Sequence, residues 1–241
     1  MRAFVFAYRE WAFNIAESIL HNPDKPSVSV FTPSEYLELA QDNLPASVSL
    51  KAIDPKNMSA IRHLFDKEDV LLFYGWSWMV PASFTDELTC ICLHPSPLPK
   101  YRGGSPIQNQ VMAGEKTGAV TLFKMTRGLD DGPICFQSQI SLEGSLEDIF
   151  DNIFYAGLVG TEKMLWEMKQ GTIRFVEQDS TQATYCKRRK PEESEIIPGD
   201  TSQQILNKIR CLQYPYPTAF IAGADGKKVY ITGAYCDKED C

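Results

Sequence analysis

The chain has 241 residues, of which 44% are hydrophobic, and its formal net charge is −7. That length is enough to bury a sizeable core without metals or disulfides, and the negative charge gives little overall attraction to a polyanion such as nucleic acid. No run approaches the roughly 18 apolar residues that a membrane span needs. We therefore expect neither a nucleic acid nor a membrane as a partner.

The cysteines and the N-terminus bear on the compartment. The 7 cysteines are an odd number without C-x-x-C spacing, so no metal site is expected, and free thiols are best tolerated under reducing conditions. Arg9 and Glu10 lie where a signal peptide would need its apolar stretch. These features favour a cytoplasmic protein.

The first half of the chain alternates apolar runs with helical patterns. Helices are expected over EWAFNIAESIL and SEYLELAQ. Strands are expected over RAFVFA, SVSVFT, DVLLFYGW and LTCICLH, and the continuous run DVLLFYGW is typical of a parallel strand covered on both faces. The alternation predicts an α/β fold with a Rossmann-like open, mostly parallel sheet.

A dinucleotide site is not expected in this sheet. The turn after the first strand, YREW, contains no glycine that would let a pyrophosphate approach the next helix. No GxxxxGK[ST] sequence occurs either.

The second half begins with two further strands, GAVTLFKM and PICFQSQIS, separated by TRGLDDG. Ser145 and Asp148 resemble a capping box, and apolar residues at helical spacing extend this helix to about Lys169. Another helix is expected over TSQQILNKIRCL, and a hairpin around Asp225-Gly226. We predict a catalytic core over residues 1–180 and a small C-terminal helix and hairpin appendage over 181–241.

Two reactive side chains end one of the expected strands. Cys92 and His94 are two residues apart, so they share a face, and they lie at the carboxyl edge where open α/β sheets bind ligands. In the loop that follows, Lys100 and Arg102 supply cations that suit a phosphate.

A carboxylate in the later GLDDGP loop, Asp130, can orient or charge-stabilise an imidazole such as His94. Because Asp and Gly are common turn formers, a solvated turn explains the loop equally well from the pair alone.

Taken together, HPSPLPKYRGGSPIQ and GEKTGAVTLFKMTRGLDDGPI closely resemble the folate-dependent formyltransferases. This family includes methionyl-tRNA formyltransferase, glycinamide ribonucleotide transformylase and nucleotide-sugar N-formyltransferases. The resemblance is strong over about 90–135 and weaker across 70–180, and TYCKRRKPEES and YPYPTAF are similar to the sugar-modifying branch. It implies a core that binds 10-formyltetrahydrofolate, whose formyl carbon is attacked by a primary amine.

The resemblance also implies catalytic residues. The family has an Asn–His–Asp set, in which His94 matches the histidine and Asp130 the aspartate; Asp131 fits less well because the pattern is Asp, any residue, Gly. His94 would then assist proton transfer and help to stabilise the developing oxyanion, while Asp130 would hold the imidazole.

Cys92 departs from this pattern, because the family has asparagine there and a thiol is a weak hydrogen-bond donor. Three hypotheses follow. The favoured one is an active enzyme in which another group or a water replaces the amide. The second is a degenerate fold that binds ligands without turnover. The third, a Cys92 thiolate that carries the formyl group, competes with simple packing of a small residue at a strand end.

The expected binding residues form two sets. Folate would contact the aromatic run after the strand and the GLDDG loop: Tyr74, Trp76, Trp78, Met79, Gly128, Leu129 and Asp131. Substrate would contact the loop after His94: Lys100, Arg102, Gly103, Gly104 and Gln108. The aromatic residues fit core packing at a strand end as an alternative.

For the acceptor, the acidic chain and short appendage favour a nucleotide-linked amino sugar of the bacterial surface glycan type, either O-antigen or pseudaminic acid. A methionyl-tRNA formyltransferase-like enzyme is the alternative. A homodimer through the C-terminal region is also considered.

Overall fold

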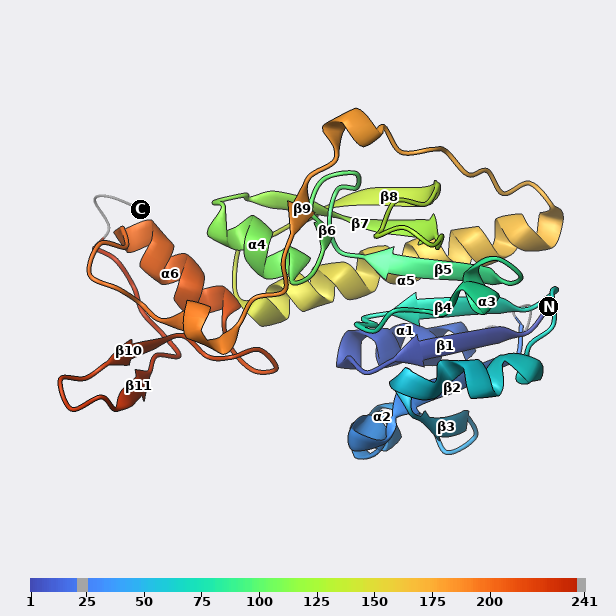
Figure 1. The fold of residues 1–241 in the computed structure, drawn as a ribbon, viewed down its shortest axis with the longest axis horizontal. Helices are drawn as coiled ribbons and strands as arrows, with labels where there is room; N and C mark the ends of the chain where they lie inside the picture. Colours follow the sequence, from blue (N-terminus) through green and yellow to red (C-terminus); the bar gives the residue numbers. More distant parts are fainter. Residues whose placement is uncertain (21–25, 238–241) are drawn as a thin grey trace.

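The computed structural model describes residues 1–20 and 26–237. Its main sheet contains β1 (Ala3–Ala7), β2 (Val28–Pro33), β3 (Ser49–Ile53), β4 (Val70–Tyr74), β5 (Thr89–His94), β7 (Thr117–Lys124) and β8 (Ile134–Ser141). The spatial order is β3-β2-β1-β4-β5-β7-β8 (Figure 1). The first five strands in this order pair in parallel, while β7 and β8 are antiparallel additions. The predicted α/β fold with an open, mostly parallel sheet is confirmed.

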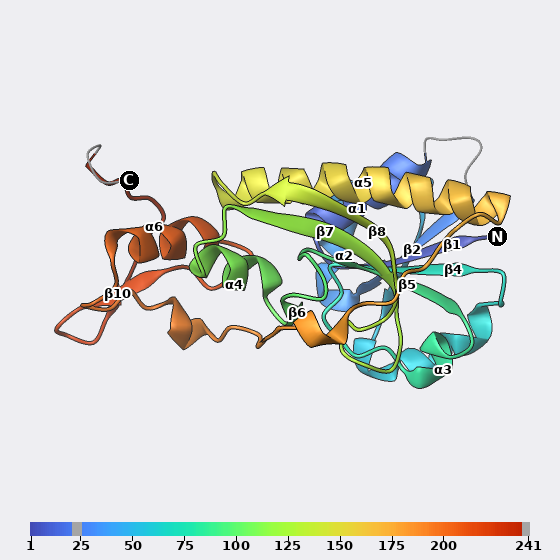
Figure 2. The same cartoon turned by 90° about the horizontal axis from the view of Figure 1, so that it is seen from above.

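Helices cover both faces of the sheet. The α-helices are α1 (Glu10–Leu20), α2 (Leu37–Asn43), α3 (Ala82–Thr85), α4 (Pro106–Met112), α5 (Leu146–Gln170) and α6 (Ser202–Cys211). The 3-10 helices are η1 (Ser34–Tyr36), η2 (Pro55–Leu64), η3 (Ser180–Gln182) and η4 (Pro191–Ser194). Figure 2 shows α1 and α5 on one face and α3 on the other. Across residues 1–20 and 26–237, no helix is both long and apolar enough to span a membrane.

Local sequence signals place the long helix α5. The Ser145 hydroxyl accepts from the Asp148 amide and the Asp148 side chain accepts from the Ser145 amide, so the predicted capping box is present. Gly157 lets α5 approach both β5 and α1 closely, because a Cβ there would lie 2.7 Å from Leu93 Cδ1 of β5 and 2.8 Å from Ile15 Cδ1 of α1.

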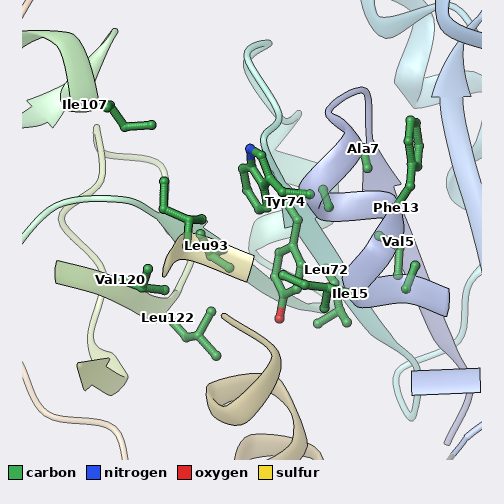
Figure 3. Close-up of a cluster of buried hydrophobic side chains, with 14 of the residues drawn as sticks. Val5, Ala7, Phe13, Ile15, Leu72, Tyr74, Leu93, Ile107, Val120 and Leu122 are labelled. Carbon is green, nitrogen blue, oxygen red and sulfur yellow. The ribbon is translucent and has the colours of Figure 1, made fainter. Parts of the chain in front are cut away.

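Side-chain alternation along β5 puts the reactive residues on one face. Ile91 and Leu93 belong to the main hydrophobic core, in which Figure 3 shows Leu93, whereas Cys90 belongs to a second, aromatic cluster on the opposite face. Because strand side chains alternate with a period of two, Cys92 and His94 share the face of Cys90. The carboxyl ends of β4 and β5 point toward α4 and the C-terminal elements (Figure 1).

The C-terminal part of the chain contributes to both the core and the loop after His94. The short strand β9 (Tyr185–Cys186) pairs in parallel with β6 (Arg102–Gly103), in the loop after His94. The strands β10 (Phe220–Ala222) and β11 (Lys228–Tyr230) form the expected hairpin. Apolar residues beyond residue 180 join the main core: Ile209, Cys211, Leu212 and Ala219.

Buried thiols should make this fold sensitive to alkaline pH. Burial raises the pKa of Cys90, Cys135 and Cys211 to about 12, from an ordinary value of 9.0. A raised folded-state pKa contributes stability that is complete below the unfolded value and is lost as pH rises toward the folded one. The free energy of unfolding should therefore fall from about pH 9 upward, by up to about 1.4 kcal/mol per pH unit for each thiol.

Urea denaturation at neutral pH and at several pH values above 9 measures this slope. A Cys90→Ala/Cys211→Ala variant should show a shallower decline than the native chain. An unfolding free energy that is constant across this range would contradict the prediction.

Candidate active site

His94 ends β5 and is held between two loops. Its Nε2 lies 2.9 Å from the carbonyl oxygen of Tyr101, and its Nδ1 lies 3.6 Å from Asp130 Oδ2. The second separation is an ion-pair distance, longer than a hydrogen bond, and catalytic contacts often shorten only when substrate binds. Both ring nitrogens face oxygen atoms, so the imidazole has a defined orientation at the carboxyl edge of the sheet.

Asp130 reaches His94 from the loop between β7 and β8. Its φ angle is 50°, in the left-handed region, and its carboxylate accepts a hydrogen bond of 2.8 Å from the Gly103 amide. The neighbouring Asp131 is exposed, and its carboxylate accepts from the Thr126 hydroxyl within the same loop. Of the two aspartates, Asp130 therefore faces the imidazole.

Cys92 is half-buried on the same strand face as His94. Burial, with a smaller contribution from the charge of Asp130, raises the pKa of the Cys92 thiol well above its ordinary value. The thiol is therefore protonated at neutral pH. Since the thiolate is the nucleophilic form of cysteine, this environment disfavours a covalent formyl carrier.

Aromatic side chains lie beyond the end of β4. The rings of Trp76 and Trp78 are 4.9 Å apart, both half-buried, and Trp78 packs edge-on to Tyr8 at 5.0 Å. Two apolar side chains of the predicted cofactor set are more exposed: Met79 by 74% and Leu129 by 49%.

Tyr74 does not belong with these aromatic residues. It is fully buried, and its hydroxyl lies 2.8 Å from the Thr161 hydroxyl of α5, within the cluster of Figure 3. Successive strand residues point to opposite faces, so Tyr74 projects away from the face that carries His94. This corrects our expectation that Tyr74 lines a folate pocket.

A model of the formyl transferase family matches residues 24–150. The chain belongs to this family. It is 33% identical over 210 residues to a methionyl-tRNA formyltransferase of Campylobacter curvus, covering 84% of this chain and 68% of that protein. The fold matches a sugar N-formyltransferase from a Shewanella species with a TM-score of 0.77 at 17% identity, covering 99% of both chains.

The fold also matches HypX from Aquifex aeolicus, solved in complex with tetrahydrofolic acid, with a TM-score of 0.73 at 18% identity; the match covers 99% of this chain and 38% of HypX. At these identities the structural matches establish a shared fold.

The predicted substrate-binding residues of this formyltransferase separate into exposed and buried groups. Lys100 is exposed, whereas Gln108 and Arg102 are 1% and 2% exposed. The Arg102 guanidinium donates to Gln178 Oε1 and to the Tyr185 hydroxyl. Arg102 thus does not present its charge at the surface, which corrects our expectation that it contacts a substrate phosphate.

Gly103 and Gly104 allow another part of the chain, rather than a ligand, to come close. A Cβ at Gly103 would lie 2.4 Å from the Cys186 carbonyl oxygen, and one at Gly104 would lie 2.6 Å from the Arg188 amide nitrogen. Segment 184–188 therefore crosses directly over the loop after His94. We call this segment the strap.

A hollow of about 520 Å³ lies beside the loop after β7. Its lining residues come from α3, the end of β7 and that loop: Thr85, Asp86, Lys124, Met125, Thr126, Arg127, Gly128 and Pro133. Of the predicted cofactor-binding residues, this hollow contains Gly128. An ion pair between Arg127 and Asp86 joins the loop to α3.

Sequence reasoning missed three residues around the His94–Asp130 pair. The Tyr101 carbonyl faces His94 Nε2, the Gln178 amide contacts the Asp130 loop, and the Cys186 carbonyl packs on Gly103. All three act through or upon main-chain atoms, for which side-chain type gives no signal. The only sequence signal for the strap was the resemblance of TYCKRRKPEES to the sugar-modifying branch of the family.

Replacing Cys92 tests what the site does without an amide there. We expect Cys92→Ala to retain transfer activity within about tenfold, because a protonated thiol neither attacks carbon nor donates strongly. Steady-state rates of the two purified proteins measure this, and loss of all activity in folded Cys92→Ala would restore the covalent hypothesis.

Cys92→Asn reports on the missing donor. One oxyanion donor is typically worth about 10²- to 10³-fold in kcat. A rise in kcat toward that size would mean that the native site lacks such a donor. An unchanged kcat would mean that another group already supplies the hydrogen bond. Asn109 is not that group, because its amide nitrogen donates to the carbonyls of Gly104, Ser105 and Lys187.

Proposed function

We propose that this formyltransferase moves a formyl group from 10-formyltetrahydrofolate to the primary amine of a nucleotide-linked amino sugar used in surface glycan synthesis. The observation that carries the proposal is the approach of Asp130 to His94 at the carboxyl edge of the sheet. That arrangement puts a titratable ring and its orienting carboxylate where open α/β sheets receive ligands.

The residues around the site fit a folate. Trp76 and Trp78 supply aromatic surface. Met79, in the loop after β4, and Leu129, in the loop between β7 and β8, are exposed apolar side chains. The indole nitrogen of Trp76 is buried without a hydrogen-bond partner among the described residues, and an indole N–H is a donor that suits the ring nitrogens and carbonyl of a pteridine. When bound, the folate supplies the formyl group.

The chain's own residues handle the proton. Because the Tyr101 carbonyl can only accept a hydrogen bond, it holds a proton on His94 Nε2. Nδ1, on the side of Asp130, is then the nitrogen that accepts the proton that an attacking amine must lose, as a general base. Asp130, 3.6 Å from Nδ1, orients the ring and balances the charge that the imidazole gains. Asp130 in turn is fixed by the Gly103 amide, so that its carboxylate stays directed at the ring.

Exposed cations beside the site support a phosphate-bearing acceptor. Lys100 lies six residues beyond His94, and Lys187 and Arg188 of the strap are exposed where the strap crosses Gly104. Exposed lysine and arginine side chains suit a diphosphate, while the overall charge of −7 disfavours a large polyanion.

Formylation of methionyl-tRNA is the second candidate. The 33% identity to the methionyl-tRNA formyltransferase of Campylobacter curvus favours it. The same exposed cations would then contact the tRNA acceptor end, where phosphates are also present.

One experiment separates these substrates. The protein is incubated with 10-formyltetrahydrofolate and, in parallel, with a panel of nucleotide-linked amino sugars or with methionyl-tRNA. Tetrahydrofolate release and the mass of the acceptor are followed, and His94→Ala is the control in each arm. Formylation of a sugar alone supports the proposal, and formylation of methionyl-tRNA alone replaces it with the second candidate. Folate binding without transfer to any acceptor would indicate a binding module.

A further inference from the structure

Arg102 is a buried cation whose hydrogen-bond partners among the described residues are neutral. It is 2% exposed; its Nε and Nη2 donate to Gln178 Oε1 at 3.1 and 2.7 Å, and its Nη1 donates to the Tyr185 hydroxyl at 3.2 Å. Burial of an arginine without a carboxylate partner is costly. Its contacts lead toward the loop that carries Asp130.

Gln178 links Arg102 to that loop. Its Nε2 donates to the carbonyl oxygens of Asp130 at 2.9 Å and Gly132 at 2.7 Å. A side-chain amide has one accepting end and one donating end. Because Arg102 offers only donors, it holds the oxygen of Gln178 and so directs the nitrogen toward the two carbonyls.

Asp130 is held through both its side chain and its main chain. The Gly103 amide, next to Arg102 in the chain, donates to the Asp130 carboxylate at 2.8 Å, while Gln178 holds the Asp130 carbonyl. Asp130 has a φ of 50°, a left-handed conformation that is uncommon outside glycine and that aspartate and asparagine adopt more readily than other residues. The hydrogen bonds from Gly103 and Gln178 hold Asp130 in this conformation.

We propose that Gln178, oriented by Arg102, is a positioning residue that holds the Asp130 carboxylate toward His94. The inference deepens the proposed function, on whose His94–Asp130 chemistry it rests. Arg102 acts in the same link, as the group that sets the direction of the Gln178 amide.

Gln178→Glu isolates the donating half of the link. A glutamate still accepts from Arg102, and does so as an ion pair, but it has no N–H for the carbonyls of Asp130 and Gly132. Gln213→Glu is the matched control: Gln213 Nε2 likewise donates to two carbonyls, those of Ile209 and Thr232, in the C-terminal part of the chain.

Two readouts are taken, one of them independent of substrate. In amide-resolved NMR, Gln178→Glu should displace the Gly103 amide resonance, which reports the hydrogen bond to Asp130, and Gln213→Glu should not. In steady-state kinetics, Gln178→Glu should lower kcat by about 10- to 100-fold, the usual effect of losing an orienting partner, with KM changed by less than about threefold.

Arg102→Met supplies a second test. It should lower kcat similarly, and the Arg102→Met/Gln178→Glu double variant should lose about as much as either single variant, because both break one link. If the charge of Gln178→Glu prevents folding, Gln178→Met is used in its place.

A folded Gln178→Glu or Gln178→Met protein with native kcat and a native Gly103 resonance would overturn the proposal. Equal kcat losses in Gln178→Glu and Gln213→Glu would also overturn it, since the effect would then be general destabilisation. If no acceptor is formylated by the native protein, the proposed function fails, and the Gly103 resonance alone still decides whether Gln178 positions Asp130.

Discussion

Replacing His94 with alanine should lower kcat/KM for formyl transfer by about 10²- to 10⁴-fold, the contribution of a positioned general acid or base. His94 is the side chain that meets Asp130 at the carboxyl edge of the sheet, and its ring is oriented from both nitrogens. Initial rates of tetrahydrofolate release, measured with the acceptor identified above, give the ratio.

His63→Ala is the control for this variant. His63 is exposed in η2, and its replacement should leave the rate unchanged. His94→Ala also removes one of the two hydrogen bonds to the Tyr101 carbonyl, leaving that from the Cys186 thiol, at a cost of about 0.5–1.5 kcal/mol in unfolding free energy, so both proteins are compared at a temperature where each is folded. Full activity in folded His94→Ala would remove the central catalytic assignment.

Replacing Asp130 with asparagine should lower kcat by about 10²- to 10³-fold, as expected when one electrostatic partner of the reacting groups is lost. Asparagine is the informative choice because it tolerates the left-handed conformation that Asp130 adopts. Its side-chain oxygen can still accept from the Gly103 amide, so the loop should keep its shape while the charge beside His94 disappears.

Asp131→Asn provides the matched control, one residue away in the same loop. Asp131 is exposed and contacts Thr126 rather than His94, so its amide variant should keep kcat within about threefold of native. Loss of the folate contact expected of Asp131 would instead raise KM for 10-formyltetrahydrofolate. If kcat falls equally in the two variants, or falls further in Asp131→Asn, then the assignment of Asp130 as the functional carboxylate is wrong. The thermal stability of both variants checks that the loop is intact.

Much of the fold follows from local patterns in the sequence. The apolar runs that became β1, β2, β4 and β5 lie among helical stretches, and burial of such runs on both faces favours parallel pairing. The start of α5 was readable because its capping box is a contact between residues three apart. The short elements β3, α3 and η2 lacked such patterns and were not predicted.

The resemblance of HPSPLPKYRGGSPIQ and the GLDDG loop to the formyltransferase family also predicted that His94 and Asp130 pair, and the two side chains do lie close together. Tertiary structure alone decided the direction in which Tyr74 and Arg102 point. Tyr74 follows the pleat of β4 into the core, and Arg102 turns inward to Gln178, 76 residues away. Contacts at such separations depend on how the loops and strap pack together, and residue type or spacing carries no record of that packing.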